Sequence, residues 1–259
     1  MQKYLYKLVR KLFFKVCNLI QIEIPIKYYG TNYGGWYIAE QYISGNLEVI
    51  SAGVGEDISF DIEILNKFNS KVIFIDPTPR SIAHLEKVIA NLGKKKTEDY
   101  DNHSGNQKVQ SYELSNIQID DFIHIEKALY DQSALNIKFY KPKNEAFVSH
   151  SISNFQNQYN KKSDFIEVST VSLEDVVNEY DINEIDILKL DIEGAENQVI
   201  PSFLKRKIFP KQLLVEFDEL STSYIRPYLK AFVILMKLNL NSYKLIKTGN
   251  FPNFLFIRE

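Results

Sequence analysis

Three short segments place an acidic residue or a glycine directly after an apolar run. They read VISAGVGED at residues 49–57, VIFIDPTP at residues 72–79 and ILKLDIEGAE at residues 187–196. Carboxylates at such positions can bind a cation, take up a proton or accept hydrogen bonds from hydroxyl groups. In open α/β sheets, ligands bind in the crevice outside the carboxyl ends of the parallel strands. The three segments therefore predict one crevice that binds a polar cofactor.

The elements that would position these segments alternate along the chain. We expect strands at residues 47–52, 71–76, 122–129, 185–191 and 213–218. We expect helices at residues 57–67, 80–91, 173–180, 195–204 and 225–238. This alternation predicts a mainly parallel, doubly wound α/β sheet with right-handed crossovers. Residues 243–246 and 254–257 have no room for a helix between them, so we expect a C-terminal antiparallel hairpin.

The composition limits the class of protein. With 259 residues, 45% of them hydrophobic, the chain can bury a full-sized core, which we assign to one domain over residues 26–259. The 31 basic and 33 acidic residues give no global positive field, which argues against nucleic acid as a partner. A single cysteine, Cys17, excludes an intrachain disulfide and predicts a cytoplasmic protein. No apolar run reaches the roughly 20 residues that span a bilayer.

Residues 1–25 hold a basic amphipathic segment with helical periodicity. The apolar face consists of Leu5, Leu8, Val9, Leu12, Phe13, Val16 and Leu19. The opposite face is basic and consists of Lys3, Lys7, Arg10, Lys11 and Lys15. Such a helix either makes a peripheral contact with the inner face of an anionic membrane through residues 1–20 or packs its apolar face on the main domain. The sequence leaves both alternatives open.

An aromatic loop and a polar segment interrupt the alternation. Residues 28–37, YYGTNYGGWY, are broken by Gly34 and Gly35, which permit a close backbone approach. Trp36 would then cover a ligand or plug the edge of the sheet. Residues 93–116 are almost entirely polar and predict a mobile excursion to which we assign no chemistry.

Residues 131–169 form a third interruption, which we interpret as a lid. They contain an expected strand at residues 136–140 and the polar stretch VSHS at residues 148–151. Loops at the carboxyl ends of strands often carry functional residues, and this one would fold over the crevice. Its histidine, His150, would then face the site.

The residues around the glycine turn distinguish between cofactors. A dinucleotide fingerprint needs a third small residue where this chain has Ile58, and Glu56 and Asp57 would repel a pyrophosphate at the start of the helix. S-adenosylmethionine carries a sulfonium and an ammonium but no phosphate, so the same carboxylates attract it. Asp76 follows Gly55 by 21 residues and can accept both ribose hydroxyls. Glu56 and Asp57 also have a structural alternative, because acids in a first helical turn favour the helix dipole.

A series of motifs in the chain resembles a known family. The segments GVGEDIS, IDPTP, KALYD, VSHS, ILKLDIEGAE and LLVEF, in this order, are similar to those of the FkbM-type S-adenosylmethionine-dependent methyltransferases. The resemblance implies a class I methyltransferase Rossmann-like fold, with which the antiparallel hairpin agrees. It also implies methyl transfer to a hydroxyl oxygen of a sugar, a glycan or a related natural product.

The resemblance and the charge argument together assign a cofactor site. Gly53 and Gly55 match the cofactor turn of the family, Asp76 matches the ribose acid, and residues 127–129 match the strand end near the adenine. The predicted cofactor-binding residues are Ser51, Gly53, Gly55, Glu56, Asp57, Asp76, Lys127, Ala128 and Leu129.

In-line methyl transfer to a hydroxyl also needs a base within hydrogen-bond reach. Asp191, which the resemblance places beside the methyl group, is our first choice, with Glu193, Asp218 and His150 as further catalytic candidates. The three carboxylates could gather a divalent metal, but their spacing does not demand one, and we predict none. Glu216 should be a buried, hydrogen-bonded acid that faces neighbouring loops.

The chain departs from the family pattern at three places. Many members have an acid where Ser51 stands, a glycine where Asp57 stands and a histidine pair where Asp218-Glu219 stands. These departures support an alternative hypothesis, a non-catalytic methyltransferase-fold module that recruits a glycan-assembly complex to a membrane. A nicotinamide oxidoreductase on a related sheet is a third, weaker hypothesis, against which Ile58 and the terminal hairpin both count.

Overall fold

A computed structural model of the chain describes residues 2–142, 150–157, 160 and 163–259. Its centre is a seven-stranded sheet. The strands are β3 Leu47–Ala52, β4 Ser70–Ile75, β5 Phe122–Ile125, β9 Ile187–Leu190, β10 Gln212–Glu216, β11 Tyr243–Ile246 and β12 Asn253–Arg258. Their spatial order is β11-β12-β10-β9-β3-β4-β5, and β12 is antiparallel to both of its neighbours. The expected mainly parallel α/β sheet with a C-terminal antiparallel hairpin is therefore confirmed.

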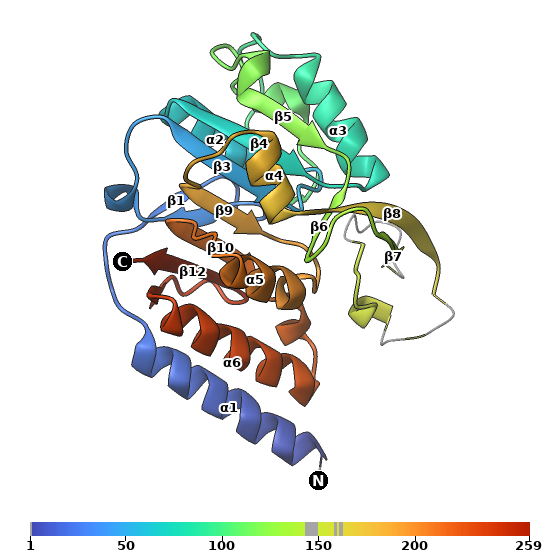
Figure 1. Cartoon of the computed structure of the whole chain (residues 1–259). Helices are drawn as coiled ribbons and strands as arrows, with labels where there is room; N and C mark the ends of the chain where they lie inside the picture. Colours follow the sequence, from blue (N-terminus) through green and yellow to red (C-terminus); the bar gives the residue numbers. More distant parts are fainter. Residues whose placement is uncertain (1, 143–149, 158–159, 161–162) are drawn as a thin grey trace.

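Helices cover both faces of the sheet (Figure 1). They are α1 Gln2–Ile20, α2 Ser59–Lys67, α3 Pro79–Ile89, α4 Leu173–Glu179, α5 Glu196–Lys205 and α6 Ile225–Leu240. Alternate strand residues point to opposite faces, so Ile50 and Leu188 pack with α1, α4, α5 and α6, whereas Val49 and Ile187 pack with α2 and α3. Two apolar cores thus hold the sheet between two helical layers, as in a doubly wound fold.

Local sequence signals explain where several of these helices begin. Pro79 occupies the first turn of α3, where its missing N–H leaves no hydrogen bond unmade. Ser172 caps α4, because its hydroxyl accepts a hydrogen bond from the Asp175 N–H at 3.2 Å. This hydrogen bond satisfies one of the backbone N–H groups that the first turn of α4 would otherwise leave unpaired.

The expected strand at residues 122–129 is wrong in one respect, because it is two strands in two sheets. β5 ends at Ile125, where the chain makes a tight turn and changes direction. In this turn the Lys127 N–H donates to the Ile125 carbonyl at 2.9 Å. Glu126 and Lys127 are both exposed, so nothing buries the chain here and it leaves the edge of the large sheet. The continuation is β6 Ala128–Tyr130.

A small sheet stands beside the carboxyl ends of the large one. It has the order β6-β8-β7, with β7 at Asn136–Tyr140 and β8 at Phe165–Ser172. Most of the predicted lid belongs to this sheet and to the short 3-10 helix η4 Phe155–Asn157. Part of the predicted lid lies outside the described residues, namely residues 143–149, 158, 159, 161 and 162. Val148 and Ser149 of the VSHS motif are among these residues.

The aromatic loop and the polar segment both pack on the domain. The loop pairs β1 Lys27–Tyr29 with β2 Trp36–Ile38 as a two-stranded antiparallel sheet, and Trp36 is buried. Within residues 93–116, Tyr112 and Leu114 are buried in the core on the α2 side. This packing differs from the mobile excursion that we expected. The two buried side chains, Tyr112 and Leu114, attach the polar segment to the domain. The remaining 3-10 helices are η1 Glu40–Tyr42, η2 Val109–Ser111, η3 Ile119–Asp121 and η5 Asp218–Ser221.

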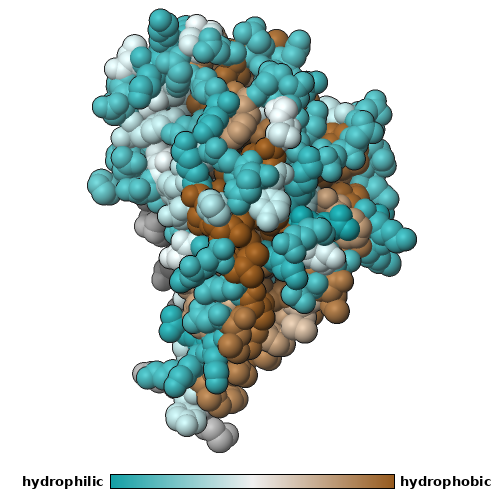
Figure 2. Space-filling model, turned by 90° about the vertical axis from the view of Figure 1, so that its left-hand side faces the viewer, coloured by the Kyte–Doolittle hydropathy of each residue, from teal (hydrophilic) through white to brown (hydrophobic). Residues whose placement is uncertain are grey.

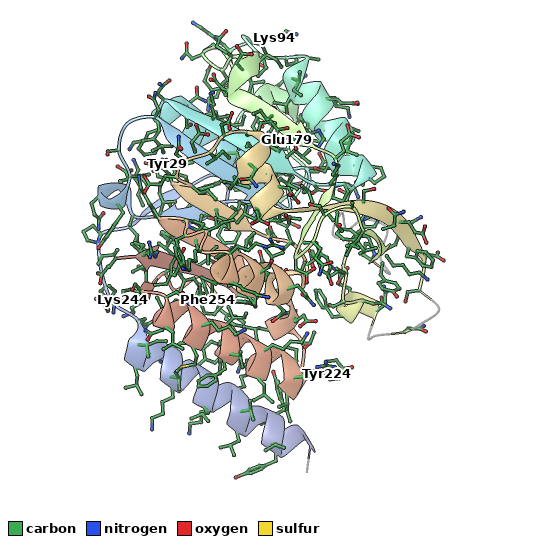
Figure 3. The ribbon with its side chains drawn as sticks, viewed as in Figure 1. Tyr29, Lys94, Glu179, Tyr224, Lys244 and Phe254 are labelled. Carbon is green, nitrogen blue, oxygen red and sulfur yellow. The ribbon has the colours of Figure 1, made fainter. Side chains whose placement is uncertain are left out.

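α1 packs against α6, but only through part of its apolar surface. Phe13 and Cys17 are buried, and Phe13 makes edge-to-face ring contacts with Tyr228 of α6 and with Phe254 of β12, which Figure 3 labels. The leucines that we placed on the same face remain exposed. Among the described residues, no helix combines the length and the apolar character that crossing a bilayer requires.

Candidate functional site

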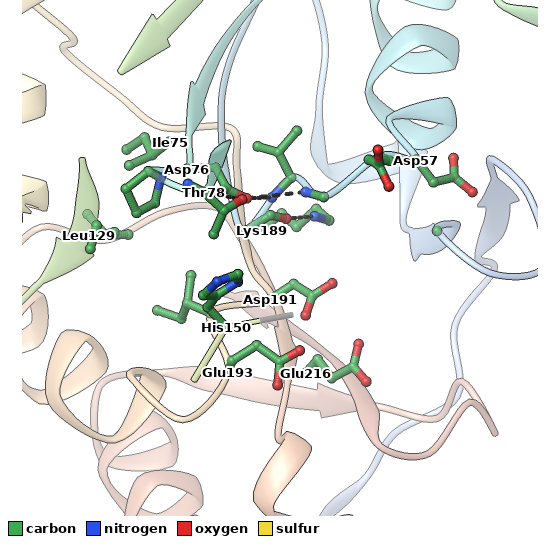
Figure 4. Close-up of a pocket in the computed structure, with 18 of the residues that line it drawn as sticks. Asp57, Ile75, Asp76, Thr78, Leu129, His150, Lys189, Asp191, Glu193 and Glu216 are labelled. Carbon is green, nitrogen blue, oxygen red and sulfur yellow. Dashed lines mark hydrogen bonds between the residues drawn. The ribbon is translucent and has the colours of Figure 1, made fainter. Parts of the chain in front are cut away.

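A cavity of about 300 Å³ lies at the carboxyl ends of β3, β4, β9 and β10. The small sheet closes one side of it through β6 and β7, and the aromatic loop closes another. Figure 4 shows the side chains that converge on this space. Gly53, Asp76 and Asp191 of the described lining belong to the three sequence segments that predict this crevice, and β10, the next strand of the sheet, adds Glu216.

The turn after β3 requires glycine at Gly53. Its φ is +78°, and a Cβ added there would lie 1.6 Å from the Asp191 carbonyl oxygen. The turn is fixed on both sides, since the Gly53 N–H donates to the Ile75 carbonyl at 3.0 Å and the Asp191 N–H donates to the Ala52 carbonyl at 2.9 Å. Gly55 also has a positive φ, +61°, but has open space around it. The first glycine therefore lets two strand ends touch, and the second leaves room beside them.

Asp76 lines the cavity but already has protein partners. Its Oδ2 accepts the N–H groups of Val54 at 2.8 Å and Gly55 at 3.2 Å. Its Oδ1 accepts the N–H of Thr78 at 2.8 Å and the Thr78 hydroxyl at 2.7 Å. The carboxylate therefore ties the glycine turn to the end of β4. Of these four donors, the Thr78 hydroxyl is the one that can rotate away and leave an acceptor position to a ligand.

The acids that follow the glycine turn, Glu56 and Asp57, both have structural partners. Glu56 lines the cavity and forms an ion pair with Arg80 of α3. Asp57 accepts the Thr31 hydroxyl at 2.5 Å and the Ser59 N–H at 3.0 Å, so it joins the aromatic loop to the start of α2. A Cβ on Gly34 would lie 2.7 Å from the Asp57 carboxyl carbon, which explains the glycine in that loop.

Lys189 brings the one positive charge to the described cavity wall. It sits in the middle of β9, is buried, and its Nζ donates to the Gly53 carbonyl at 2.7 Å. A buried ammonium is stable only beside compensating groups. Those groups are the carbonyl of the glycine turn and the neighbouring carboxylates, including Asp191, whose pKa Lys189 lowers.

Acidic side chains gather on the opposite wall, where Figure 4 labels Asp191, Glu193 and Glu216 below Lys189. Asp191, Glu193 and Asp218 can each place one carboxylate oxygen within 4.8 Å of the others. Glu216, at the end of β10, lines the same space. Glu216 is a hydrogen-bonded acid, as expected, with Asp218 as its partner, but it faces the cavity instead of neighbouring loops. Asp191, Glu193 and Asp218 form the group of described residues that could hold a metal ion, and our expectation of none stays a prediction.

Burial and mutual repulsion raise the pKa values of this cluster. Burial is the larger cause for Glu216, and Asp191 and Glu193 add to it, which brings the pKa of Glu216 to about 9. The same two causes, with Glu193 the strongest neighbour, hold the pKa of Asp218 well above its ordinary value. Burial also raises the pKa of Asp191, with Lys189 opposing it. Near neutral pH Glu216 therefore keeps its proton, and a cationic ligand beside it would favour its ionised form.

The turn that carries Glu193 is held by the lid segment. Glu193 has a φ of +51° and precedes Gly194 at +102°, so two left-handed residues in a row aim the carboxyl group. Gln156 of η4 donates to Glu193 Oε2 at 3.0 Å, and the Ser151 hydroxyl donates to the Glu193 carbonyl at 2.9 Å. Glu196 closes the turn by accepting the Gly194 N–H at 3.1 Å.

The remaining predicted site residues divide into two groups. His150, Ala128 and Leu129 line the cavity, with the His150 ring turned toward the same space as Asp191 (Figure 4). Ser51 and Lys127 do not line it. Ser51 is fully buried in β3 below the turn, and Lys127 is exposed between β5 and β6.

A comparison with models of protein families agrees with this geometry. Residues 46–237 match the methyltransferase FkbM domain. The chain belongs to this family. The resemblance noted in the sequence is thereby confirmed, and the family indicates a methyltransferase. Searches of the curated proteins and of the solved structures gave no match.

Several residues of the candidate site in this FkbM-family chain were not anticipated. Tyr33, Thr78, Gly105 and Phe139 line the cavity, as does Lys189. Lys189 offered the clearest signal, because a lysine inside an apolar strand must find a charged or carbonyl partner. No sequence signal pointed to Gly105. The Tyr33 ring packs against this glycine, and a Cβ on it would lie 2.4 Å from the ring.

Proposed function

We propose that the protein is an S-adenosylmethionine-dependent O-methyltransferase of class I, Rossmann-like fold that acts on a hydroxyl of a sugar, a glycan or a related natural product. The observation that carries the proposal is the excess of acids over bases in the cavity. Its described lining contains seven acids, of which Glu56 is paired with Arg80 and Glu216 keeps its proton near neutrality, and one lysine, Lys189, whose ammonium is engaged by the Gly53 carbonyl. Such a site attracts a cation and repels a pyrophosphate, which argues against a dinucleotide.

The residues present fit the cofactor. S-adenosylmethionine supplies an electrophilic methyl group on a sulfonium. The cavity of about 300 Å³ is within the range of small-ligand sites. Gly53 and Gly55 leave backbone beside the space free of side chains. Asp76 would accept ribose hydroxyls in place of the Thr78 hydroxyl, and Leu129 would provide an apolar wall for the adenine.

The acceptor would meet the acidic wall. A general base must be ionised at the working pH, so a pKa of about 9 excludes Glu216 from that role near neutrality. Asp191 is our proposed base, because it ends β9 beside the glycine turn and Lys189 favours its ionised form. His150 faces the same space and is the alternative proton acceptor. Tyr33 and Phe139 present aromatic surface suited to a sugar ring.

Calorimetry and turnover test the proposal together. The wild-type chain should bind S-adenosylmethionine and its demethylated product, and it should not bind NADH. With a labelled methyl donor and a cell extract, the label should appear on a hydroxyl-bearing product. Binding of NADH alone would refute the proposal.

Asp191→Asn separates chemistry from cofactor binding. This variant should keep cofactor affinity within a few fold and reduce turnover by about 10²- to 10⁴-fold, the usual contribution of a positioned base. Glu179→Gln, at an exposed position in α4, serves as the matched control and should behave as wild type. Unchanged turnover in Asp191→Asn would remove Asp191 from the mechanism. Binding without turnover on any hydroxyl acceptor, even in the wild type, would favour the non-catalytic module.

A further inference from the structure

α1 and α6 form a surface that the proposed reaction does not use. Ten of the sixteen large apolar side chains that are exposed among the described residues belong to these two helices. They are Tyr4, Leu5, Leu8, Leu12 and Leu19 of α1 and Leu229, Phe232, Val233, Met236 and Leu240 of α6. Figure 2 shows a hydrophobic band that descends through the part of the molecule where α1 lies, with hydrophilic groups beside it. We call these ten residues the α1–α6 surface.

α1 packs on the domain through a face that does not contain its exposed leucines. The seam against α6 and the sheet is centred on Phe13 and Cys17, and the Tyr6 and Phe13 rings both contact Tyr228 of α6. The partly buried side chains of α1 that pack on the same core are Tyr6, Val9, Phe14 and Ile20. Leu8 and Leu12 are 53% and 58% exposed, respectively. The helix is therefore anchored without its leucines, and their exposure follows from the fold.

The charged residues of α1 and α6 are all basic. α1 carries five basic residues and α6 carries three, and neither helix contains Asp or Glu, although the whole chain has a net charge of −2. Lys11 and Lys15 follow Leu8 and Leu12 by three residues, so each lysine is a surface neighbour of a leucine. Lys230 of α6 is paired with Glu219 at 3.1 Å. Apolar and cationic groups are thus interleaved on one exposed surface.

We propose that the α1–α6 surface docks on the surface of an anionic lipid bilayer. An amphipathic helix with leucines beside lysines binds such a surface by burying its apolar side chains among the acyl chains and its ammonium groups among the phosphates. On this proposal, α1 combines the two alternatives that the sequence left open. α1 packs on the domain through Phe13 and Cys17 and offers its leucines and lysines to the membrane.

A second copy of the chain is a poorer occupant of this surface. Docking through the same helices would bring together surfaces that carry basic residues and no acids, and like charges in contact are destabilising. A nucleic acid would match the lysines but leave the leucines without an apolar partner. The bilayer surface satisfies both kinds of group.

Vesicle flotation with the full chain tests the proposal. The wild type should float with vesicles of phosphatidylcholine mixed with phosphatidylglycerol, should bind pure phosphatidylcholine much more weakly, and should lose affinity as ionic strength rises. The double variant Leu8→Glu/Leu12→Glu should bind the mixed vesicles at least tenfold more weakly. The matched control is Ile119→Glu, which places the same charge on η3 at a side chain 57% exposed, and it should bind as wild type. Circular dichroism should show all three proteins folded.

Charge and oligomeric state complete the test. Lys7→Gln/Lys11→Gln/Lys15→Gln should weaken binding to mixed vesicles by about one hundredfold, because each lysine near an anionic surface contributes roughly fivefold. The wild type should remain monomeric in light scattering at the same protein concentration. The proposal is overturned if the wild type ignores anionic vesicles, if Leu8→Glu/Leu12→Glu binds them as well as Ile119→Glu does, or if the wild type is a dimer that Leu8→Glu/Leu12→Glu dissociates.

Discussion

Glu216 shows how one side chain links the chemistry of the cavity to the stability of the fold. In the unfolded chain its carboxyl group would ionise near its ordinary pKa of 4.5, whereas in the folded chain it keeps its proton up to about pH 9. Between these values the unfolded state loses a proton that the folded state retains. The contribution of Glu216 to stability is therefore fully present below about pH 4.5 and is lost as the pH rises to about 9.

Glu216→Gln should flatten this pH dependence. The amide cannot ionise, so the variant should unfold at least ~2 °C above the wild type at pH 8 and at nearly the same temperature at pH 4.5. Thermal unfolding followed by circular dichroism at several pH values measures the difference. Glu179→Gln is the control and should reproduce the wild-type profile. Parallel profiles for wild type and Glu216→Gln would show that Glu216 ionises normally.

At the scale of the elements, the glycine turn after β3 determines how close two strand ends come. Gly53→Ala would place a methyl group into the Asp191 carbonyl oxygen, with backbone on both sides and no flexible neighbour to move. Gly55→Ala meets open space and only the left-handed φ opposes it, at a cost of about 1–2 kcal/mol. Urea unfolding should show a clearly larger loss for Gly53→Ala, together with loss of cofactor binding. Equal losses in the two variants would contradict the close approach of β3 and β9.

The contact between η4 and the β9–α5 turn should affect the acceptor more than the cofactor. Gln156→Ala removes the hydrogen bond to Glu193, worth roughly 1 kcal/mol, and should raise the KM for the acceptor about fivefold with little change in kcat. Gln110→Ala, at an exposed position, is the control. A change in cofactor affinity without a change in KM would mean that η4 does not serve the acceptor side.

The sequence predicted best those elements whose signal is local. β3, β4, β9 and β10 are buried apolar runs that end in glycine or acid, and this pattern also located the cavity. The division between β5 and β6 depends on which sheet receives the chain after Ile125, which no local pattern records.

The inward direction of Glu216 was missed for a similar reason. Glu216 is the last residue of β10, and the cavity that lies beyond this strand end is formed by residues from distant parts of the chain. Tyr33 and Gly105 meet across 72 residues of sequence, so their contact is a property of the folded chain alone.

At the scale of the whole molecule, the cofactor should act as a ligand of the folded state. At a concentration one hundred times its dissociation constant, S-adenosylmethionine should add about 2.7 kcal/mol to the free energy of unfolding. This corresponds to a rise of roughly 5–10 °C in Tm for a chain of this size. A thermal shift assay measures the rise, and NADH at the same concentration is the control. A rise with NADH and none with S-adenosylmethionine would reverse the assignment of the cofactor.

The charges of the protein are distributed asymmetrically over the molecule. The cavity wall is acidic, and the exposed helices α1 and α6 are basic, so the nearly neutral total of −2 conceals two regions of opposite sign. Long-range fields of this kind orient a protein relative to charged surfaces before any contact forms.

Cys17 gives this molecule a built-in reporter. It is the sole sulfhydryl of the chain and lies buried in the seam beneath α1, where burial raises the pKa of its thiol to about 11. Because the thiolate is the reactive species, alkylating reagents should leave Cys17 untouched while α1 stays seated. Any event that lifts α1 from α6 would uncover it, so the rate of alkylation of the unaltered chain records how often this helix detaches.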